Sequence, residues 1–231
     1  MRVRNSGILL WDIDGTLIKT KKTVPSVHIQ AIRTLGFYIN EIPGSHQGLT
    51  DYEVIKQILN DNRISPAEEQ MAQIFLALDE AHQLNFNTGD RELCKGINRE
   101  FLFSLCSEWS LGVLTGNTEL RAKSKLSSFN LLDLFEPECI FTSQFKETRK
   151  ELAIRAKREC LELAENDEEF KIIIIGDSPN DVTAARAANL PIITVASGGF
   201  DYVTLNDTNP NMTIENFDVE LRNFNSMLLK V

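Results

Sequence analysis

The fold of this 231-residue chain is decided by the stretch Ile8-Leu9-Leu10-Trp11-Asp12-Ile13-Asp14-Gly15-Thr16-Leu17. A short apolar run ends in two carboxylates, Asp12 and Asp14, which a glycine and a hydroxyl follow. If the run is a strand of a parallel sheet, both acids lie at its carboxyl edge, where α/β folds bind ligands. Two carboxylates this close repel each other unless a cation lies between them. The stretch therefore predicts a buried strand that leads directly into a cation-binding site.

Short apolar runs alternate with helical patterns along most of the chain. We expect strands at 8–12, 111–115, 139–142, 172–176 and 192–195. The clearest is Ile172-Ile173-Ile174-Ile175, because β-branched residues favour strands and Gly176-Asp177-Ser178-Pro179 then predicts a turn. Strands that are apolar throughout and separated by helices are typical of a parallel sheet covered on both faces. The sequence therefore predicts an α/β core with helices on both faces.

Strand patterns vanish between the first two expected strands, and helical patterns replace them. We expect one helix at 26–35 that Gly36 ends, and a second after Thr50-Asp51. A third should begin at Ser65-Pro66-Ala67-Glu68, with Ser65 as the N-cap and Glu68 closing a capping box. We therefore predict an all-helical cap at 20–93, inserted into a catalytic core formed by 1–19 and 94–231.

Two further strand ends carry polar groups. Thr115, Gly116 and Asn117 follow the second strand, where a hydroxyl and exposed amides can form a small anion cradle. Asp177 follows the most apolar strand, and Asp181 lies in the next helical turn, where it or Ser178 can serve as a helix cap. Asp177 together with Asp12 and Asp14 offers an all-oxygen site suited to Mg²⁺.

A phosphate beside three acids needs a fixed cation, and the segment 143–150 supplies candidates. Thr148-Arg149-Lys150-Glu151 is a capping-box pattern, so we expect a helix to begin after Thr148. Lys146 then lies in the preceding loop, Arg149 at the first helical position and Lys150 one residue further round. Lys146 and Arg149 are both candidates, and the loop position favours Lys146.

Composition and charge exclude several classes of partner. The formal net charge is −9, which argues against broad electrostatic binding to nucleic acid or to an anionic membrane. The first apolar run is too short for a signal-peptide core or a membrane span. The four cysteines are widely spaced without a C-x-x-C pair, which favours reduced thiols over disulfides or zinc. We therefore expect a cytoplasmic protein whose partner is a small molecule.

The ordered motifs resemble those of the haloacid dehalogenase-like hydrolase superfamily. The resemblance is carried by Asp12-Ile13-Asp14-Gly15-Thr16, Thr115-Gly116-Asn117, a basic residue at 146–150, and Gly176-Asp177-Ser178 with Asp181. It covers essentially the whole chain, is strongest to phosphoglycolate phosphatase-type members, and implies a Rossmann-like core with a helical cap. The usual Lys-Pro pair of the third motif is missing, because Glu147 follows Lys146.

The resemblance implies a Mg²⁺-dependent phosphatase that hydrolyses a small phosphorylated metabolite, phosphoglycolate-like or a sugar phosphate. Asp12 would attack phosphorus and form an aspartyl-phosphate, and Asp14 would act as general acid and then general base. Asp12, the Asp14 backbone carbonyl and Asp177 would hold Mg²⁺. Thr115, Gly116 and Asn117 would bind the phosphoryl oxygens, and Asp181 would orient the cation or a metal-bound water.

The cap should select the substrate, and the loop 43–51 is the expected specificity element. Its two glycines allow a close approach to the site, and its polar side chains can contact a ligand; we expect this of His46, Gln47, Thr50 and Asp51.

Rival functions differ in what they require of these residues. A phosphomutase of the same superfamily stays open as the alternative. A dehalogenase needs no acid at Asp14, and a non-catalytic binding protein would not need every main catalytic position filled. The P-loop pattern of a kinase does not occur in the sequence.

Overall fold

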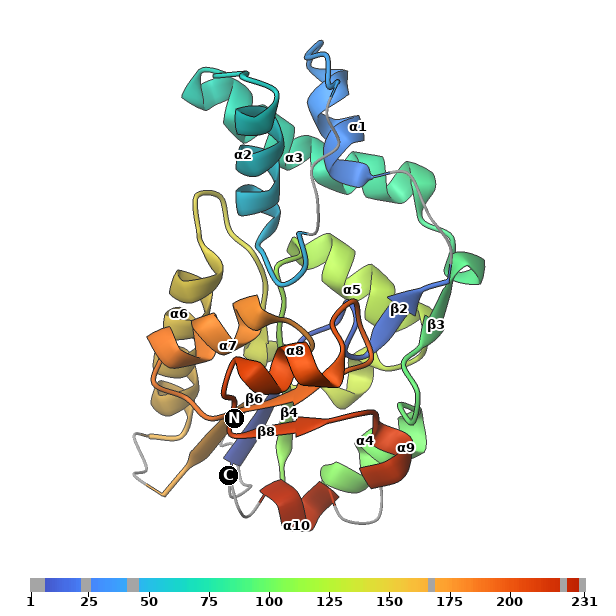
Figure 1. The fold of residues 1–231 in the computed structure, drawn as a ribbon, viewed down its shortest axis with the longest axis vertical. Helices are drawn as coiled ribbons and strands as arrows, with labels where there is room; N and C mark the ends of the chain where they lie inside the picture. Colours follow the sequence, from blue (N-terminus) through green and yellow to red (C-terminus); the bar gives the residue numbers. More distant parts are fainter. Residues whose placement is uncertain (1–6, 22–25, 41–45, 166–168, 221–223, 229–231) are drawn as a thin grey trace.

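The protein is described by a computed structural model that covers residues 7–21, 26–40, 46–165, 169–220 and 224–228. Its centre is a six-stranded sheet in the order β5-β4-β1-β6-β7-β8, and every neighbouring pair is parallel (Figure 1). The strands are β1 (Gly7–Trp11), β4 (Ser110–Leu114), β5 (Ile140–Phe141), β6 (Lys171–Gly176), β7 (Ile192–Val195) and β8 (Met212–Ile214). All five strands expected from the sequence are present, and β8 is an additional one.

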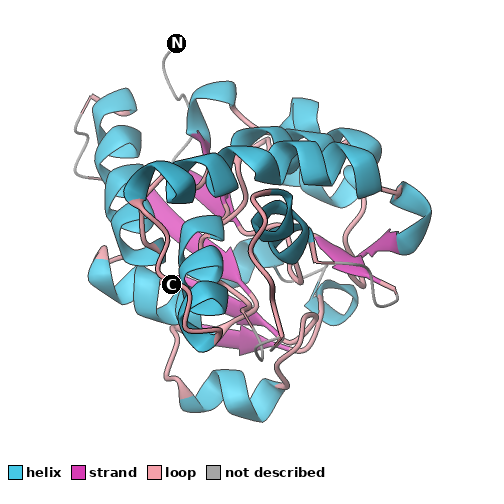
Figure 2. Cartoon of the chain, turned by 90° about the horizontal axis from the view of Figure 1, so that it is seen from above, coloured by secondary structure: helices cyan, strands magenta, loops and turns pink. Residues whose placement is uncertain are grey.

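Helices cover both faces of this sheet, as Figure 2 shows from above. Leu9 and Trp11 of β1 pack toward one face, and Ile8 and Leu10 toward the other, because alternate side chains of a strand point in opposite directions. The first face is covered by α4 (Arg99–Leu105), α5 (Glu119–Ser128), α9 (Phe217–Glu220) and α10 (Phe224–Leu228). The second is covered by α6 (Arg149–Leu163) and α7 (Pro179–Ala187), while α8 (Tyr202–Asp207) packs near β7 and β8. The predicted two-sided α/β core is confirmed.

Three helices form a separate layer above the sheet, at the top of Figure 1. They are α1 (Val27–Thr34), α2 (Asp51–Asp61) and α3 (Glu68–Asn85), and they share their own hydrophobic cluster, which includes Ile32, Ile55 and Leu78. Gly36 has a φ of +81°, a conformation that favours glycine, and it follows the end of α1 as expected. The start of α3 differs from the prediction. Ala67 is the N-cap, and its N–H donates to the Gln70 side chain at 3.0 Å, so Ser65 does not cap the helix.

A short antiparallel ribbon connects this helical layer to the sheet. Strand β2 (Ile18–Thr20) pairs with β3 (Arg91–Leu93), and a 3₁₀ turn at Thr88–Asp90 precedes β3. The ribbon was not predicted from the sequence, because strands of three residues carry too little pattern. The ribbon brings the outgoing and returning chains side by side where they leave the sheet.

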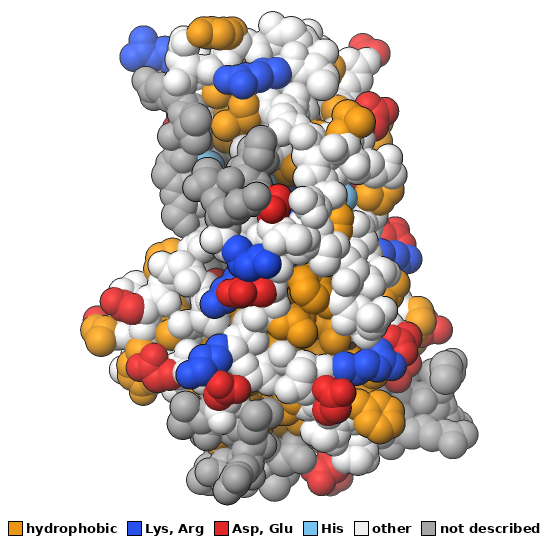
Figure 3. Space-filling view, turned by 90° about the vertical axis from the view of Figure 1, so that its right-hand side faces the viewer, with side chains coloured by type: hydrophobic (Ala, Val, Ile, Leu, Met, Phe, Trp, Pro, Cys, Tyr) orange, Lys and Arg blue, Asp and Glu red, His pale blue; other side chains and the backbone are white. Residues whose placement is uncertain are grey.

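The surface on the face shown in Figure 3 carries basic and acidic side chains intermixed, without a large area of a single sign. Among the described residues, no helix combines the length and apolar character that a membrane crossing requires.

Candidate active site

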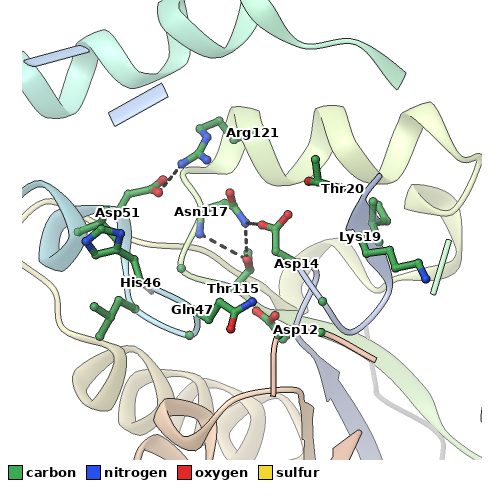
Figure 4. Close-up of a pocket in the computed structure, with 18 of the residues that line it drawn as sticks. Asp12, Asp14, Lys19, Thr20, His46, Gln47, Asp51, Thr115, Asn117 and Arg121 are labelled. Carbon is green, nitrogen blue, oxygen red and sulfur yellow. Dashed lines mark hydrogen bonds and ion pairs between the residues drawn. The ribbon is translucent and has the colours of Figure 1, made fainter. Parts of the chain in front are cut away.

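The carboxyl ends of β1, β4 and β6 meet below the helical layer, and residues after β1 and β4 line a cavity of about 440 Å³ there. Asp12 follows β1, Thr115 follows β4 and Asp177 follows β6. Strand β1 lies between β4 and β6, so this is the point where the chain order of the sheet reverses, and ligands of α/β folds bind at such points. Figure 4 shows Asp12, Asp14, Thr115 and Asn117 around the cavity, with His46 and Gln47 entering from the cap side.

Three buried acids form the centre of the site. Carboxylate oxygens of Asp12, Asp177 and Asp181 all lie within 4.8 Å of one another. Thr16 Oγ1 donates to Asp177 Oδ1 at 3.3 Å, whereas Asp177 Oδ2 is buried and has no hydrogen-bond partner among the described residues. A Cβ at Gly15 or Gly198 would lie within 2.1 Å of Oδ2, so only glycine lets these loops approach it. An unpartnered carboxylate oxygen beside another acid fits a hard cation such as Mg²⁺.

The same crowding disfavours the ionised forms of two of these acids. Burial raises the pKa of Asp12 to about 7, and Asp181 and Asp14 add to this effect while Arg149 opposes it. Burial, reinforced by the neighbouring carboxylates, holds the pKa of Asp177 well above its usual range. A divalent cation would relieve both effects, because it favours the charged form of each ligand.

Arg149 is the cation that the structure places at this cluster. Its Nη2 donates to Asp181 Oδ1 at 2.6 Å, to Leu114 O at 3.0 Å and to Asp12 Oδ1 at 3.1 Å. The side chain is 3% exposed, and the paired acids hold its pKa above the usual value despite burial. Asp181 Oδ2 accepts bonds from Ser178 Oγ and N at 2.7 and 3.1 Å, so Asp181 both closes a capping box for α7 and orients Arg149.

The predicted position of Lys146 at the site is wrong. The helix does begin at Arg149, with Thr148 as its N-cap, but Lys146 turns away from the strand ends. Its backbone has a φ of +69°, and its ammonium pairs with Glu68 of α3 at 2.5 Å, at the surface. Lys150 is exposed, as expected. The first turn of α6 therefore brings one of the three candidate cations, Arg149, to Asp12.

Asp14 lies on another side of the cavity and is held by two donors. Lys125 Nζ and Asn117 Nδ2 donate to its Oδ2 at 2.5 and 2.7 Å. Partial burial opposes ionisation of Asp14, but Lys125 and Asn117 together hold the pKa of its carboxyl below the usual value. The Asp14 carboxylate therefore faces Lys125 rather than the acid cluster.

The predicted phosphate cradle is assembled around Asn117. Its amide also donates to Thr115 Oγ1 at 2.7 Å, and its carbonyl accepts from Lys125 at 2.8 Å. Thr115 is fully buried at the floor of the cavity. Gly116 has a second use, since a Cβ there would lie 2.0 Å from Leu49 O, and its own carbonyl accepts from Asp51 N at 2.7 Å. Gly116 thus allows the cap to dock closely.

Three of the four residues expected to contact substrate, His46, Gln47 and Asp51, line the cavity, and Thr50 does not. Nε2 of His46 is buried without a hydrogen-bond partner among the described residues. Thr50 and Asp51 attach the cap to the core. Thr50 Oγ1 donates to Glu147 O at 2.8 Å, and the Asp51 carboxylate accepts from Thr118 N and His28 Nε2, each at 2.8 Å. Residues 43–45 of the predicted loop 43–51 lie outside the described residues.

Two basic residues of α5 were not predicted as part of the site. Lys125 binds Asp14, and Arg121 forms an ion pair with Asp51 and lines the cavity. Arg121 and Lys125 are spaced four residues apart, which places them on one face of α5, and Asn117 lies just before the helix begins. The four-residue spacing of Arg121 and Lys125 was the signal available in the sequence.

Comparisons with known proteins agree with this arrangement. Residues 9–195 match the family described as haloacid dehalogenase-like hydrolase. A phosphoglycolate phosphatase from Nitrosococcus oceani is 26% identical over 223 residues, which cover 94% of this chain and 95% of the relative.

Two solved structures show the same fold at low sequence identity. One is provisionally described as a phosphoglycolate phosphatase from Haemophilus somnus, with a TM-score of 0.63, 18% identity, and 94% and 97% of the two chains covered. The other is provisionally described as a β-phosphoglucomutase from Bacteroides vulgatus, with a TM-score of 0.66, 19% identity, and 98% and 90% covered. On the family match over most of its length, the chain belongs to the haloacid dehalogenase-like hydrolases.

Proposed function

We propose that this chain is a Mg²⁺-dependent phosphatase that hydrolyses a small phosphomonoester through an aspartyl-phosphate on Asp12. The observation that carries the proposal is the position of Asp12, which lies against Arg149 on one side and within 4.8 Å of Asp177 on the other. A carboxylate flanked by the Arg149 guanidinium and by a Mg²⁺ ion that Asp177 would help to hold can accept the approach of an anionic phosphate. The phosphoglycolate phosphatase relative supports a phosphomonoester as substrate.

The metal would be held by Asp12 and Asp177, with the Asp14 backbone carbonyl as the third protein ligand. Mg²⁺ bound there supplies charge screening between two anions. Asp181 is committed to Arg149 and Ser178 through both oxygens, so it supports the site rather than binding the metal. Thr115 and the amides of Gly116 and Asn117 would hold the phosphoryl oxygens.

In the first step, an Asp12 oxygen attacks phosphorus in line and the bond to the alcohol oxygen breaks. The leaving oxygen takes a proton from Asp14, and the alcohol departs. Asp14 must be protonated for this step, and the approach of an anionic phosphate raises its pKa in that direction. Arg149 stabilises the charge that remains on Asp12 and the phosphoryl group.

In the second step, Asp14 takes a proton from a water molecule as that water attacks the phosphorus of the aspartyl-phosphate. The bond from phosphorus to the Asp12 oxygen breaks, which restores the carboxylate and releases inorganic phosphate. Lys125 and Asn117 stabilise the ionised Asp14 that this step requires. The dehalogenase alternative gives Asp14 no role in leaving-group protonation.

The proposed substrate is a small metabolite, phosphoglycolate-like or a sugar phosphate, and the proposed location is the cytoplasm. All four cysteines, Cys94, Cys106, Cys139 and Cys160, are free thiols, which supports a reducing compartment.

The test is release of inorganic phosphate from a panel of phosphomonoesters, with Mg²⁺ or with EDTA. We expect metal-dependent release that Asp12→Asn abolishes, and acid-quenched wild type should carry a hydroxylamine-sensitive phosphoryl group. Conversion of a sugar phosphate to its isomer without phosphate release would instead identify a phosphomutase. Activity that survives saturating EDTA would contradict the metal site.

A further inference from the structure

A second cavity of about 210 Å³ adjoins the first on the side of α5 and the β2–β3 ribbon. Asp14, Thr20, His28 and Arg121 line both cavities, so the two spaces share a wall. Part of the second wall comes from α3, through His82 and Asn85. A ligand whose phosphate lies at Asp12 therefore has room to extend past Asp14 into this second space.

The lining of the second cavity is basic in a protein whose net charge is −9. Arg91, Arg121 and Lys125 line it, against the single acid Asp14. Lys125 neutralises Asp14, and Asp51 pairs with Arg121 from outside this lining. Arg91 lies 4.4 Å from the centre of the Phe86 ring and donates to Asn87 O, and no ion pair of Arg91 is found among the described residues. The guanidinium of Arg91 is therefore the charge of this lining without a carboxylate partner among the described residues.

Arg121 has an ion-pair partner in Asp51, but not all of its N–H donors have a hydrogen-bond acceptor in the described part of the chain. Its side chain is 7% exposed, and its Nε is buried without a hydrogen-bond acceptor among the described residues. A buried charged donor without an acceptor is costly, and a ligand oxygen would remove that cost. The planar guanidinium suits carboxylate and phosphate groups. The two histidines of this wall are neutral at pH 7, since burial lowers the pKa of His28 and lowers that of His82 to about 4.

We propose that this cavity binds an anionic group, a carboxylate or a second phosphate, on the part of the substrate that is not transferred, with Arg121 as the principal ligand. The inference rests on the proposed function only in naming that group as part of a phosphomonoester. It adds Arg121 of the core and Arg91 of the ribbon to the residues expected to select the substrate.

Binding can be measured without turnover, by calorimetry in EDTA, with three probes. 2-Phosphoglycolate carries a carboxylate, ethylene glycol bisphosphate carries a second phosphate, and 2-hydroxyethyl phosphate is neutral at that end. We expect wild type to prefer one of the anionic probes over the neutral one by tenfold or more, roughly the factor of one charged hydrogen bond. The preferred probe identifies the anionic group.

Arg121→Gln should remove this preference while its affinity for 2-hydroxyethyl phosphate changes little. Asp51→Asn is the matched control, because it breaks the same ion pair and keeps the guanidinium, and it should retain the preference. Arg91→Gln, on the more exposed wall, tests the cavity separately and should reduce the preference. Equal affinity of wild type for all three probes, or equal loss in Arg121→Gln and Asp51→Asn, would overturn the inference. Because these readouts do not involve hydrolysis, a failure of the phosphatase assay would count against the proposed function alone.

Discussion

The backbone N–H of Arg149 donates to Oε2 of Glu53 at 3.0 Å, which joins the first residue of α6 to α2 of the helical layer. The same oxygen accepts from Thr50 N at 3.0 Å. One carboxylate oxygen thus closes the capping box of α2 and satisfies a free N–H at the start of α6. Docking of the helical layer and placement of the Arg149 cation are therefore linked through Glu53.

Replacement of Glu53 should lower turnover through Arg149. We expect Glu53→Ala to reduce kcat about fivefold, since a lost helix cap costs about 1 kcal/mol, and Glu53→Gln to retain part of the bond and lose less. Steady-state kinetics would measure both. Glu69→Ala, an exposed acid of α3, is the control and should leave kcat unchanged. Equal kcat in Glu53→Ala and wild type would show that the bond between Glu53 and Arg149 does not affect turnover.

The three candidate cations should separate clearly by mutation. Arg149→Met should cost a hundredfold or more in phosphatase rate, because it removes the charge beside Asp12 and leaves Asp181 unpaired. Lys146→Ala should change the rate less than twofold, since its partner is the surface residue Glu68. Lys150→Ala should behave likewise. A severe loss confined to Lys146→Ala would mean that the loop reaches the site in the active state.

Metal binding should be visible in stability as well as in activity. Mg²⁺ should raise the Tm of wild type, because a ligand that binds only the folded state stabilises it. In EDTA, Asp177→Asn should be at least as stable as wild type, since it removes a buried charge whose Oδ2 has no partner among the described residues. Differential scanning calorimetry would test both. An unchanged Mg²⁺-induced shift in Asp177→Asn would remove this residue from the metal site.

Lys125 should matter for Asp14 although it lies 111 residues away. Lys125→Met should lower kcat tenfold or more, because Asp14 loses the donor that orients it and favours its ionised form. Lys123→Met, whose ammonium pairs with Glu119 at the surface of the same helix, is the control. Asp14→Asn should cost a hundredfold or more, the usual contribution of a general acid or base. Similar rates for the two lysine variants would contradict the assignment.

His82 gives the protein a specific sensitivity to acid. Burial, with Arg121 and Lys125 nearby, lowers the pKa of His82 to about 4 from an unfolded value of 6.5. Between these two values His82 is protonated in the unfolded chain and neutral in the folded chain. The free energy of unfolding therefore falls as pH drops from about 6.5 toward 4. Urea unfolding across this range should show a shallower pH dependence for His82→Gln than for wild type. Identical slopes would show that other groups dominate the loss.

The sequence predicted the elements whose patterns are local and strong. Strand β6 is apolar on both faces because helices cover both faces of the sheet. Its run of isoleucines therefore predicts a buried strand from the sequence alone. The Thr148 capping box predicted the start of α6 for a similar reason, since all its bonds lie within three residues.

What the sequence could not predict depends on contacts between distant segments. The choice between Lys146 and Arg149 depends on the backbone of Lys146, whose positive φ turns the side chain toward α3. Arg121 likewise acquires its role only when α2 brings Asp51 to α5. Three-residue strands such as β8 are stabilised by their neighbours in the sheet rather than by their own residues.

The pairing of β2 with β3 has a consequence for engineering. Ile18 lies opposite Leu93, so the chain leaves the sheet after β2 and returns to it through β3, at one pair of hydrogen-bonded strands. Such an excursion can be excised or exchanged at a single junction without breaking a strand of the sheet. We expect chimaeras cut between Thr20 and Arg91 to keep the chemistry of the strand ends and the anion preference that Arg91 and Arg121 confer, while the substrate contacts made by the exchanged segment change. The ribbon thus marks a junction at which the helical segment can be exchanged while the catalytic residues at the strand ends stay in place.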